Sequence, residues 1–299
     1  MVEEVLEIDV EGASVALRVY VPAADVARGG AVVLLAGMSA TMDSGLAPFA
    51  GRFAADGLVA VTFDYRHFGL SGGTPRQCLS VSKQLRDIEA VIAYTRSRRD
   101  VDEDRVGLWG SSFGGGLGVH TAVSDGRIRA LVAQCPMMDR HRSTRMGFAG
   151  RSSMQNVRIV LLAAWASLVS LFGFRGPTLP MTDPNRFCVI PCDESEKFHR
   201  IGGPRWRNEL TLQSFLRGGL HLNHPLGVAE KLHVPTLVQI CDTDQTVSNE
   251  GTLEFIAKAG ECVRATHYDC GHFDLYLAPL VGSAAEEASR FLVEHLSAI

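Results

Sequence analysis

Residues 105–123 read RVGLWGSSFGGGLGVHTAV and join an apolar run, a glycine-serine turn and a stretch of small residues. We expect Arg105–Trp109 to be a β-strand and Gly115–Val123 to begin a helix. Between them stands a G-x-S-x-G pattern with Ser112 at its centre. A chain that reverses this sharply leaves no room for side chains two residues before and after the serine, and glycine at both positions removes that conflict. The pattern therefore predicts a Ser112 hydroxyl at the apex of a strained turn.

Ser112 is a better candidate for a reactive residue than its neighbour Ser111. Centring the turn on Ser111 would place Trp109 and Phe113 where small residues are required. The helix that follows Ser112 would also direct backbone N–H groups and its positive dipole end at an anion forming there. The pattern alone is weak evidence, because glycine-serine clusters are common in loops. Its place between a strand and a helix favours Ser112 as a nucleophile.

Length and composition indicate a globular protein with a substantial core. The chain has 299 residues, of which 46% are hydrophobic and 21% charged, and these values are typical of a soluble domain. The net charge of -4 predicts no nucleic-acid partner, since a polyanion requires a basic surface. Seven cysteines without paired spacing favour reduced thiols. The start of the chain lacks the charge pattern of a signal peptide, so we expect a cytoplasmic protein.

Strand-like and helix-like segments alternate on both sides of the Ser112 turn, which predicts a doubly wound, mostly parallel α/β sheet. Continuous apolar runs at Ala31–Ala36 and Leu58–Phe63 are typical of strands buried on both faces. Alternating polar and apolar residues predict an edge hairpin over residues 2–10 and 14–21. The other expected elements are helices Leu46–Ala55, Val81–Arg98, Glu250–Ala259 and Ala284–Leu296, and strands Ile128–Gln134, Thr236–Ile240 and Cys262–Thr266.

The alternation fails in one internal segment, residues 139–230. The sheet is unfinished before this segment and is completed after it, so we expect a helical cap inserted into an α/β core formed by residues 1–138 and 231–299. Val157–Phe174 is the most apolar part of the cap. It is about 18 residues long, at the short end of what a bilayer requires, and it contains Arg158. We therefore expect a cap helix and no stable membrane span.

A serine hydroxyl is a poor nucleophile at neutral pH, so it needs a base, and the base needs an orienting acid. Both residue types follow the last two expected strands. Asp242 and Asp244 come after the first of these strands, and His267 and His272 stand at and beyond the end of the second. Because the carboxyl ends of parallel strands meet at one edge of a sheet, these side chains can reach Ser112. The chain order serine, acid, histidine is the one found in doubly wound hydrolases.

On these motifs the chain resembles the α/β-hydrolase fold superfamily over nearly its whole length outside the insertion. Within that superfamily it is most similar to the serine esterase, thioesterase and peptidase-like group, which includes relatives of dienelactone hydrolase and of the Xaa-Pro peptidases. Members often carry a Gly-x-x-Asp-x-x-Val/Ile-Pro turn around the acid. Here Cys241 stands at the glycine position and Ser248 at the proline position. This alignment implies Asp244 as the acid, with Asp242 as the alternative.

The same resemblance bears on the histidine and on the oxyanion hole. Gly271-His272-Phe273 resembles the usual Gly-His turn, whereas His267 falls at the strand end. One oxyanion donor would be the backbone N–H of Phe113, directly after the nucleophile. By resemblance the other is the N–H of Met38, where the usual His-Gly pair is replaced by Ala-Gly. A further loop that begins at Asp64 resembles the Asp-Tyr-Arg-Gly-x-Gly loop of the group, and we expect it to have a structural role.

The resemblance implies a serine hydrolase that cleaves an ester, thioester or lactone through an acyl-enzyme. Ser112 would be the nucleophile, His272 the base and Asp244 the orienting acid, with neither a metal nor a cofactor. The apolar cap suggests a small apolar acyl substrate. Hydrolysis of a C–C bond, acyl transfer and peptide cleavage on the same triad stay open, and so does a homodimer through the cap. A catalytically silent ligand binder of this fold is the alternative from another class, and an intact triad speaks against it.

Overall fold

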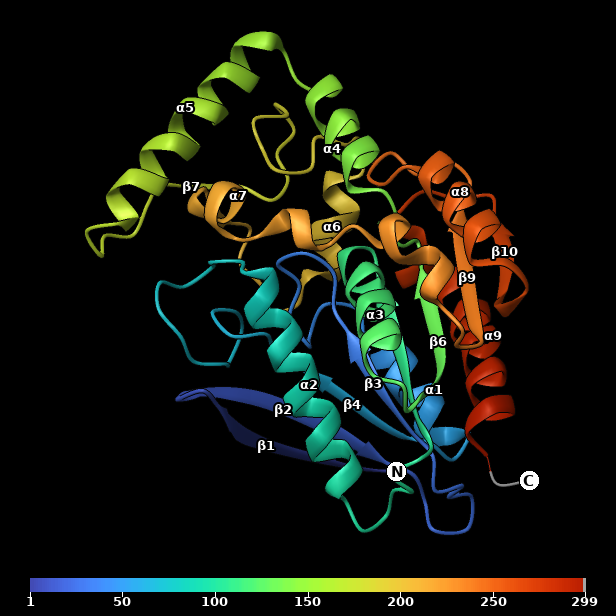
Figure 1. Cartoon of the computed structure of the whole chain (residues 1–299). Helices are drawn as coiled ribbons and strands as arrows, with labels where there is room; N and C mark the ends of the chain where they lie inside the picture. Colours follow the sequence, from blue (N-terminus) through green and yellow to red (C-terminus); the bar gives the residue numbers. More distant parts are fainter. Residues whose placement is uncertain (298–299) are drawn as a thin grey trace.

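The computed structural model describes residues 1–297, and in this range one eight-stranded sheet forms the centre of the molecule (Figure 1). The pairs β1–β2 and β2–β4 are antiparallel, and every further pair across the sheet is parallel. In spatial order the strands are β1 (Val2–Val10), β2 (Ala13–Val21), β4 (Val59–Phe63), β3 (Ala31–Leu35), β5 (Val106–Ser111), β6 (Ile128–Gln134), β9 (Thr236–Cys241) and β10 (Val263–Tyr268). The predicted mostly parallel sheet with an edge hairpin is confirmed.

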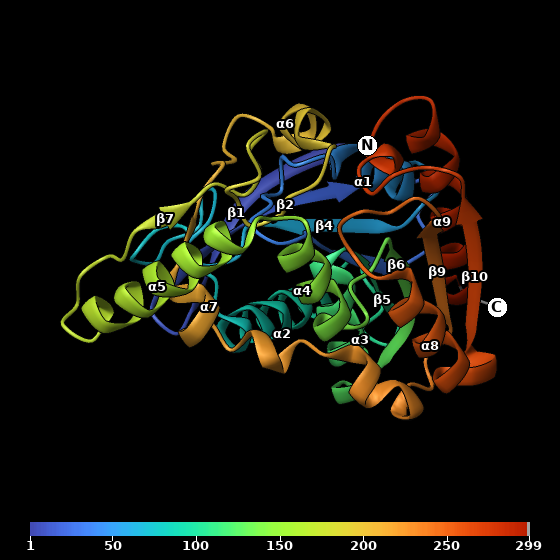
Figure 2. The ribbon, with the colours of Figure 1, turned by 90° about the horizontal axis from the view of Figure 1, so that it is seen from above.

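Helices cover both faces of the sheet, which makes the fold doubly wound (Figure 2). The inner strands β3, β4 and β5 are buried at every residue, as their continuous apolar runs predict. The strand order reverses beside β3, because the chain passes from β3 to β4 on one side and then to β5 on the other. One face carries α1 (Ala47–Ala55) and α9 (Leu280–Leu296), and the other carries α2 (Val81–Ser97), α3 (Phe113–Ser124) and α8 (Asn249–Ala259).

Several element boundaries differ from those expected. Strand β5 continues to Ser111 and α3 begins at Phe113, so the turn between them is a single residue rather than five. Strand β10 runs two residues further than expected, to Tyr268. Helix α9 begins at Leu280 rather than at Ala284, because a proline directly before it starts the helix while Gly282 weakens the helical pattern in the sequence.

The segment between β6 and β9 contributes no strand to the eight-stranded sheet within residues 1–297. We call residues 139–230 the insertion; Figure 1 shows α4 and α5 above the carboxyl ends of the strands. The structure adds a two-stranded ladder that the sequence did not predict, because its strands have two residues each. The insertion contains α4 (Arg140–Ala149), α5 (Ser153–Ser170), β7 (Thr178–Leu179), α6 (Ser195–Gly202), β8 (Leu210–Thr211), α7 (Gln213–Arg217), the 3-10 turn η1 (Leu220–Leu222) and most of η2 (Pro225–Lys231).

Helix α5 is the apolar helix expected within Val157–Phe174, displaced toward the N-terminus. It starts at Ser153 because Ser152 and Gln155 form a capping box. Within residues 1–297, no helix is both long enough and apolar enough to cross a bilayer. The inner side of α5 packs on a small core of its own, which is separate from the main core around the sheet. That small core consists of Ile159, Ala163, Ala166, Leu179 and Leu212.

Candidate active site

Ser112 occupies the single-residue turn between β5 and α3. Its backbone has φ 55° and ψ -120°, an unfavourable conformation for a residue with a side chain. A Cβ at Gly114 would lie 2.3 Å from the carbonyl oxygen of Leu35, and a Cβ at Gly110 would lie 2.6 Å from that of Gly114. Both glycines of the motif therefore let three backbone segments approach each other. The close packing holds Ser112 in its strained conformation.

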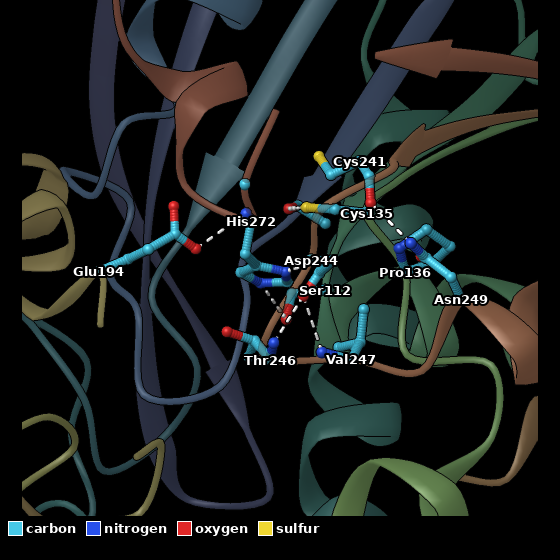
Figure 3. Close-up of polar contacts among 12 residues, drawn as sticks. Ser112, Cys135, Pro136, Glu194, Cys241, Asp244, Thr246, Val247, Asn249 and His272 are labelled. Carbon is cyan, nitrogen blue, oxygen red and sulfur yellow. Dashed lines mark hydrogen bonds and ion pairs between the residues drawn. The ribbon is translucent and has the colours of Figure 1, made fainter. Parts of the chain in front are cut away.

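The structure brings Ser112, His272 and Asp244 together at the carboxyl edge of the sheet (Figure 3). The Oγ of Ser112 lies 3.0 Å from Nε2 of His272, and Nδ1 of His272 lies 2.6 Å from Oδ2 of Asp244. The other carboxylate oxygen of Asp244 accepts hydrogen bonds from the backbone N–H groups of Thr246 (2.6 Å) and Val247 (2.9 Å). A carboxylate held in this way requires the proton of the neutral imidazole on Nδ1, which leaves Nε2 free to accept from the serine.

The environment of His272 stabilises the protonated form of its imidazole. Its side chain is 2% exposed and that of Asp244 is fully buried. Burial lowers the pKa of His272, but the adjacent Asp244 carboxylate and the buried Cys135 sulfur raise it, and the pKa lies well above its ordinary value as a result. The pair is therefore arranged to stabilise the imidazolium that forms when the serine loses its proton.

The residues weighed as alternatives lie elsewhere. Asp242 and His267 contact each other, with Oδ1 of the aspartate 2.7 Å from Nδ1 of the histidine, and their side chains are 42% and 53% exposed. Ser111 is buried, and its hydroxyl is hydrogen-bonded to the phenol of Tyr276. None of the three makes a hydrogen bond to Ser112 or His272 in the described part of the chain.

Met38 and Phe113 both border Ser112. The two residues line the same cavity as Ser112, and a Cβ at Gly37 would lie 3.5 Å from the Cβ of Ser112. Phe113 is the first residue of α3, so its N–H belongs to the unpaired amides at a helix N-terminus. The two backbone segments that the resemblance nominates as oxyanion donors thus stand beside the serine, and their role remains a prediction.

Asp64 supports the loop that contains Met38. Its Oδ1 accepts the N–H of Met42 and its Oδ2 accepts the N–H of Leu70, each at 2.7 Å. In the same region the Nε of Arg66 lies 2.5 Å from Oδ1 of Asp87, and both side chains are buried. These contacts tie the Asp64 loop to the loop that contains Met38 and to α2, which agrees with the structural role expected for the Asp64 loop.

A cavity of about 400 Å³ opens beside Ser112 and is bounded by both the core and the insertion. Its walls are mainly apolar, with a few polar side chains, including Arg140, Thr144 and Gln245. Within residues 1–297, no three His, Cys, Asp or Glu side chains are arranged to hold a metal ion. Apolar residues from both parts of the chain line the cavity: Met38, Phe113 and Met137 from the core, and Ile159, Ala163 and Phe215 from the insertion.

One further contact with His272 was missed by sequence reasoning. The backbone N–H of His272 donates to Oε2 of Glu194, at 3.0 Å, from the insertion. Glu194 lies in a proline- and glycine-rich stretch without periodicity, so no pattern marks it. The glycine at position 271 is the single local hint, since it leaves space for a neighbour.

Comparisons with known proteins identify the family and the fold of the chain. A family model described as Serine aminopeptidase, S33, matches residues 27–273. The chain is 30% identical over 276 residues to the Quorum-quenching protein AidA of Acinetobacter baumannii, spanning 90% of this chain and 86% of that one. It is 30% identical to Thiohydrolase aneE of Aspergillus aculeatus over 136 residues, 46% of this chain and 42% of that protein. The crystal structure of the α/β hydrolase GrgF from Penicillium sp. sh18 matches with a TM-score of 0.82, at 22% identity over 99% of both chains, and so shows the same fold.

Proposed function

The chain belongs to the serine aminopeptidase S33 family of α/β hydrolases, and from this membership we propose that it is a serine hydrolase that cleaves small esters, thioesters or lactones. The observation that carries the proposal is the unbroken line from Ser112 Oγ through the His272 imidazole to the Asp244 carboxylate, with separations of 3.0 and 2.6 Å. A hydroxyl, a base and an orienting acid in hydrogen-bond contact are what nucleophilic acyl transfer requires.

The proposed reaction proceeds in two stages. His272 Nε2 takes the proton of Ser112 as Oγ bonds to the acyl carbon, and the N–H groups of Phe113 and Met38 stabilise the oxyanion. His272 then gives the proton to the departing alcohol, thiol or lactone oxygen, leaving an acyl group on Ser112. Water attacks this acyl-enzyme with His272 again as the base, and Ser112 recovers its proton as the acid leaves. Asp244 holds the imidazole and its positive charge throughout.

The cavity supports a small apolar acyl group as substrate. Its volume of about 400 Å³ and its mainly apolar walls suit a medium-sized acyl chain better than an extended peptide. The similarity to a protein named thiohydrolase supports the inclusion of thioesters. In this proposal the insertion acts as a cap, because α4 and α5 provide a large part of the cavity wall. Peptide cleavage, which the family's name suggests, is the less favoured activity for a site with mainly apolar walls.

The test compares Ser112→Ala with Ser111→Ala on a panel of acyl esters, acyl thioesters and lactones of graded chain length. We expect the wild type to hydrolyse members of the panel, and Ser112→Ala to lower kcat by about 10⁴-fold or more. Ser111→Ala should stay within about tenfold of the wild type, since its hydroxyl contacts Tyr276 and Cys135 rather than Ser112 or His272. Equal rates for Ser112→Ala and wild type would overturn the proposal.

A further inference from the structure

Glu194 places a buried carboxylate against the backbone of the histidine loop. Its side chain is 9% exposed, and Oε2 accepts the His272 N–H at 3.0 Å. The contact joins residues 78 positions apart, one in the insertion and one in the loop after β10. Figure 3 shows Glu194 on the opposite side of His272 from Cys135. The loop is therefore held from the insertion as well as from the core.

The carboxylate also explains the glycine before His272. A Cβ at Gly271 would lie 2.1 Å from Oε1 of Glu194 and 2.6 Å from its carboxyl carbon. Non-bonded contacts that short do not occur for a Cβ atom, so a side chain at this position would displace either the carboxylate or the loop. Gly271 thus allows Glu194 to reach the His272 N–H.

A second set of contacts holds the carboxylate in place. The Nζ of Lys197 lies 2.9 Å from Oε1 of Glu194 and 2.7 Å from Oδ1 of Asp274. The other oxygen of Asp274 accepts the N–H of Gly271 at 2.9 Å. The start of α6 and the turn Gly271–Asp274 are in this way joined by one ammonium group. The ring of Phe198 stacks on that of Phe273 beside it, with centroids 4.8 Å apart and planes at 14°.

We propose that Glu194 is a positioning residue for His272 and that it makes the geometry of the triad depend on the insertion. This inference rests on the proposed hydrolase function. Nε2 and Nδ1 of His272 must face Ser112 and Asp244 together, and both directions follow from where its backbone lies. Small displacements of a catalytic group can reduce turnover about 10²-fold. Loss of Glu194 would also leave the buried His272 N–H without a partner, which favours movement of the loop.

The test uses steady-state kinetics on the best substrate of the panel, with Glu194→Ala and Glu194→Gln. We expect Glu194→Ala to lower kcat by about 10- to 100-fold with KM within about twofold, because the substrate cavity is not altered. Glu194→Gln keeps an amide oxygen that can accept the His272 N–H, so kcat should return to within about threefold of wild type. Glu196→Ala is the matched control, since Glu196 is exposed in the first turn of α6, two residues after Glu194. It should leave both constants unchanged.

A double-mutant cycle with Gly271→Ala makes the test sharper. The new Cβ should push against the Glu194 carboxylate and lower kcat in the wild-type background. In the Glu194→Ala background the obstacle is gone, so the same change should add little further loss. If Glu194→Ala does not fold, the kcat and unfolding temperature of Gly271→Ala alone test the proposal. A lower kcat with an unchanged unfolding temperature supports the proposal, and an unchanged kcat overturns it.

The positioning role of Glu194 and the hydrolase function are contradicted by different results. A wild-type kcat retained by Glu194→Ala overturns the positioning role while the hydrolase function stands. Equal losses in Glu194→Ala and Glu194→Gln also overturn it, because an accepting oxygen would then not be what matters. Absence of hydrolysis by the wild type, or full activity of Ser112→Ala, overturns the proposed function itself and this inference with it.

Discussion

The proposed chemistry depends on His272, because the neutral form of this residue must accept the serine proton. Burial lowers its pKa, whereas the Asp244 carboxylate and the Cys135 sulfur raise it, with a net rise well above the ordinary value. The protonated, inactive form therefore persists to higher pH than for a free imidazole. We expect kcat/KM to rise with pH and its midpoint to lie above about 6.5, the ordinary imidazole value. A pH–rate profile checks this, and a midpoint at or below that value would contradict it.

The two aspartates of one turn provide a matched pair of variants. In Asp244→Asn the amide oxygen stays on the N–H groups of Thr246 and Val247, which turns the NH2 group, a donor, toward Nδ1 of His272. This favours the wrong tautomer and removes the negative charge, so we expect kcat to fall by about 10⁴-fold and the pH midpoint to move down. Asp242→Asn breaks only an exposed contact with His267, and activity should stay within about twofold of wild type. Steady-state kinetics of both variants decides between them. Similar losses in the two would show that Asp244 is not the acid.

Single residues also show what sequence reasoning could and could not reach. Ser112 and His272 were predictable because each belongs to a local motif at a strand end. The choice between Asp242 and Asp244 needed the family resemblance, since both follow β9 and only the fold of the turn separates them. Thr246 and Val247 donate to Asp244 through backbone N–H groups, which any residue but proline has. The residue types at these two positions therefore could not predict the contacts with Asp244.

At the scale of elements, the β5–α3 turn depends on backbone contact that only glycine allows. Gly114 and Gly282 both lie in helices, but a Cβ at Gly114 would stand 2.3 Å from a carbonyl oxygen of Leu35, whereas one at Gly282 would meet nothing within 4 Å. We expect Gly114→Ala to lower the free energy of unfolding by about 2 kcal/mol or more. Gly282→Ala should raise it by about 0.5–1 kcal/mol, because alanine is the better helix former.

Denaturant unfolding of the two variants tests this difference in sign. Retained stability in Gly114→Ala would mean that α3 shifts away from β3 without cost, and the packing account of the turn would be wrong. A loss of stability in Gly282→Ala would mean that replacing a helical glycine destabilises this protein even without a steric conflict. Activity of Gly114→Ala adds a second measurement, since movement of α3 also displaces Phe113 and Ser112.

The elements themselves were predictable in unequal measure. Buried strands such as Ala31–Leu35 and helices such as Val81–Ser97 have strong periodic patterns, and the structure confirms them. The ladder of β7 and β8 was missed because two residues show no period. Helix α6 begins at Ser195 in a stretch interrupted by prolines and glycines, where local propensity gives no answer. Its first turn contacts the histidine loop, which lies far away along the chain.

At the scale of the whole molecule, the cavity between core and insertion should set the size of the acyl group. Ala163 on α5 lines the cavity and is 4% exposed. Ala163→Phe should fill part of the space and lower kcat/KM for long acyl esters by about tenfold or more relative to short ones. Leu161→Phe is the control, because Leu161 is 65% exposed on the same helix. An equal fall for short and long esters would indicate a damaged insertion and contradict this role.

The division into a core of residues 1–138 and 231–299 and a cap of residues 139–230 remains a prediction about how the molecule works. Its physical basis is that α5 and its neighbours have a small apolar core of their own, whereas other buried residues of the insertion, such as Phe198 and Leu210, belong to the main core. The insertion is also joined to the main core through Glu194 and the stacked ring of Phe198. Such joints depend on residues distant in sequence, which explains why they could not be read from composition or spacing. The sheet could be predicted because each of its strands has a recognisable pattern in the local sequence.

The most direct test of the central claim is labelling with a fluorophosphonate probe, followed by mass spectrometry of the intact protein and of its peptides. The account predicts one probe per chain in the wild type, attached to Ser112, and no label in Ser112→Ala. It also predicts strongly slowed labelling in His272→Ala, since the base is lost. A wild-type protein that stays unlabelled, or a label on any other residue, would contradict the proposal that Ser112 is an activated nucleophile.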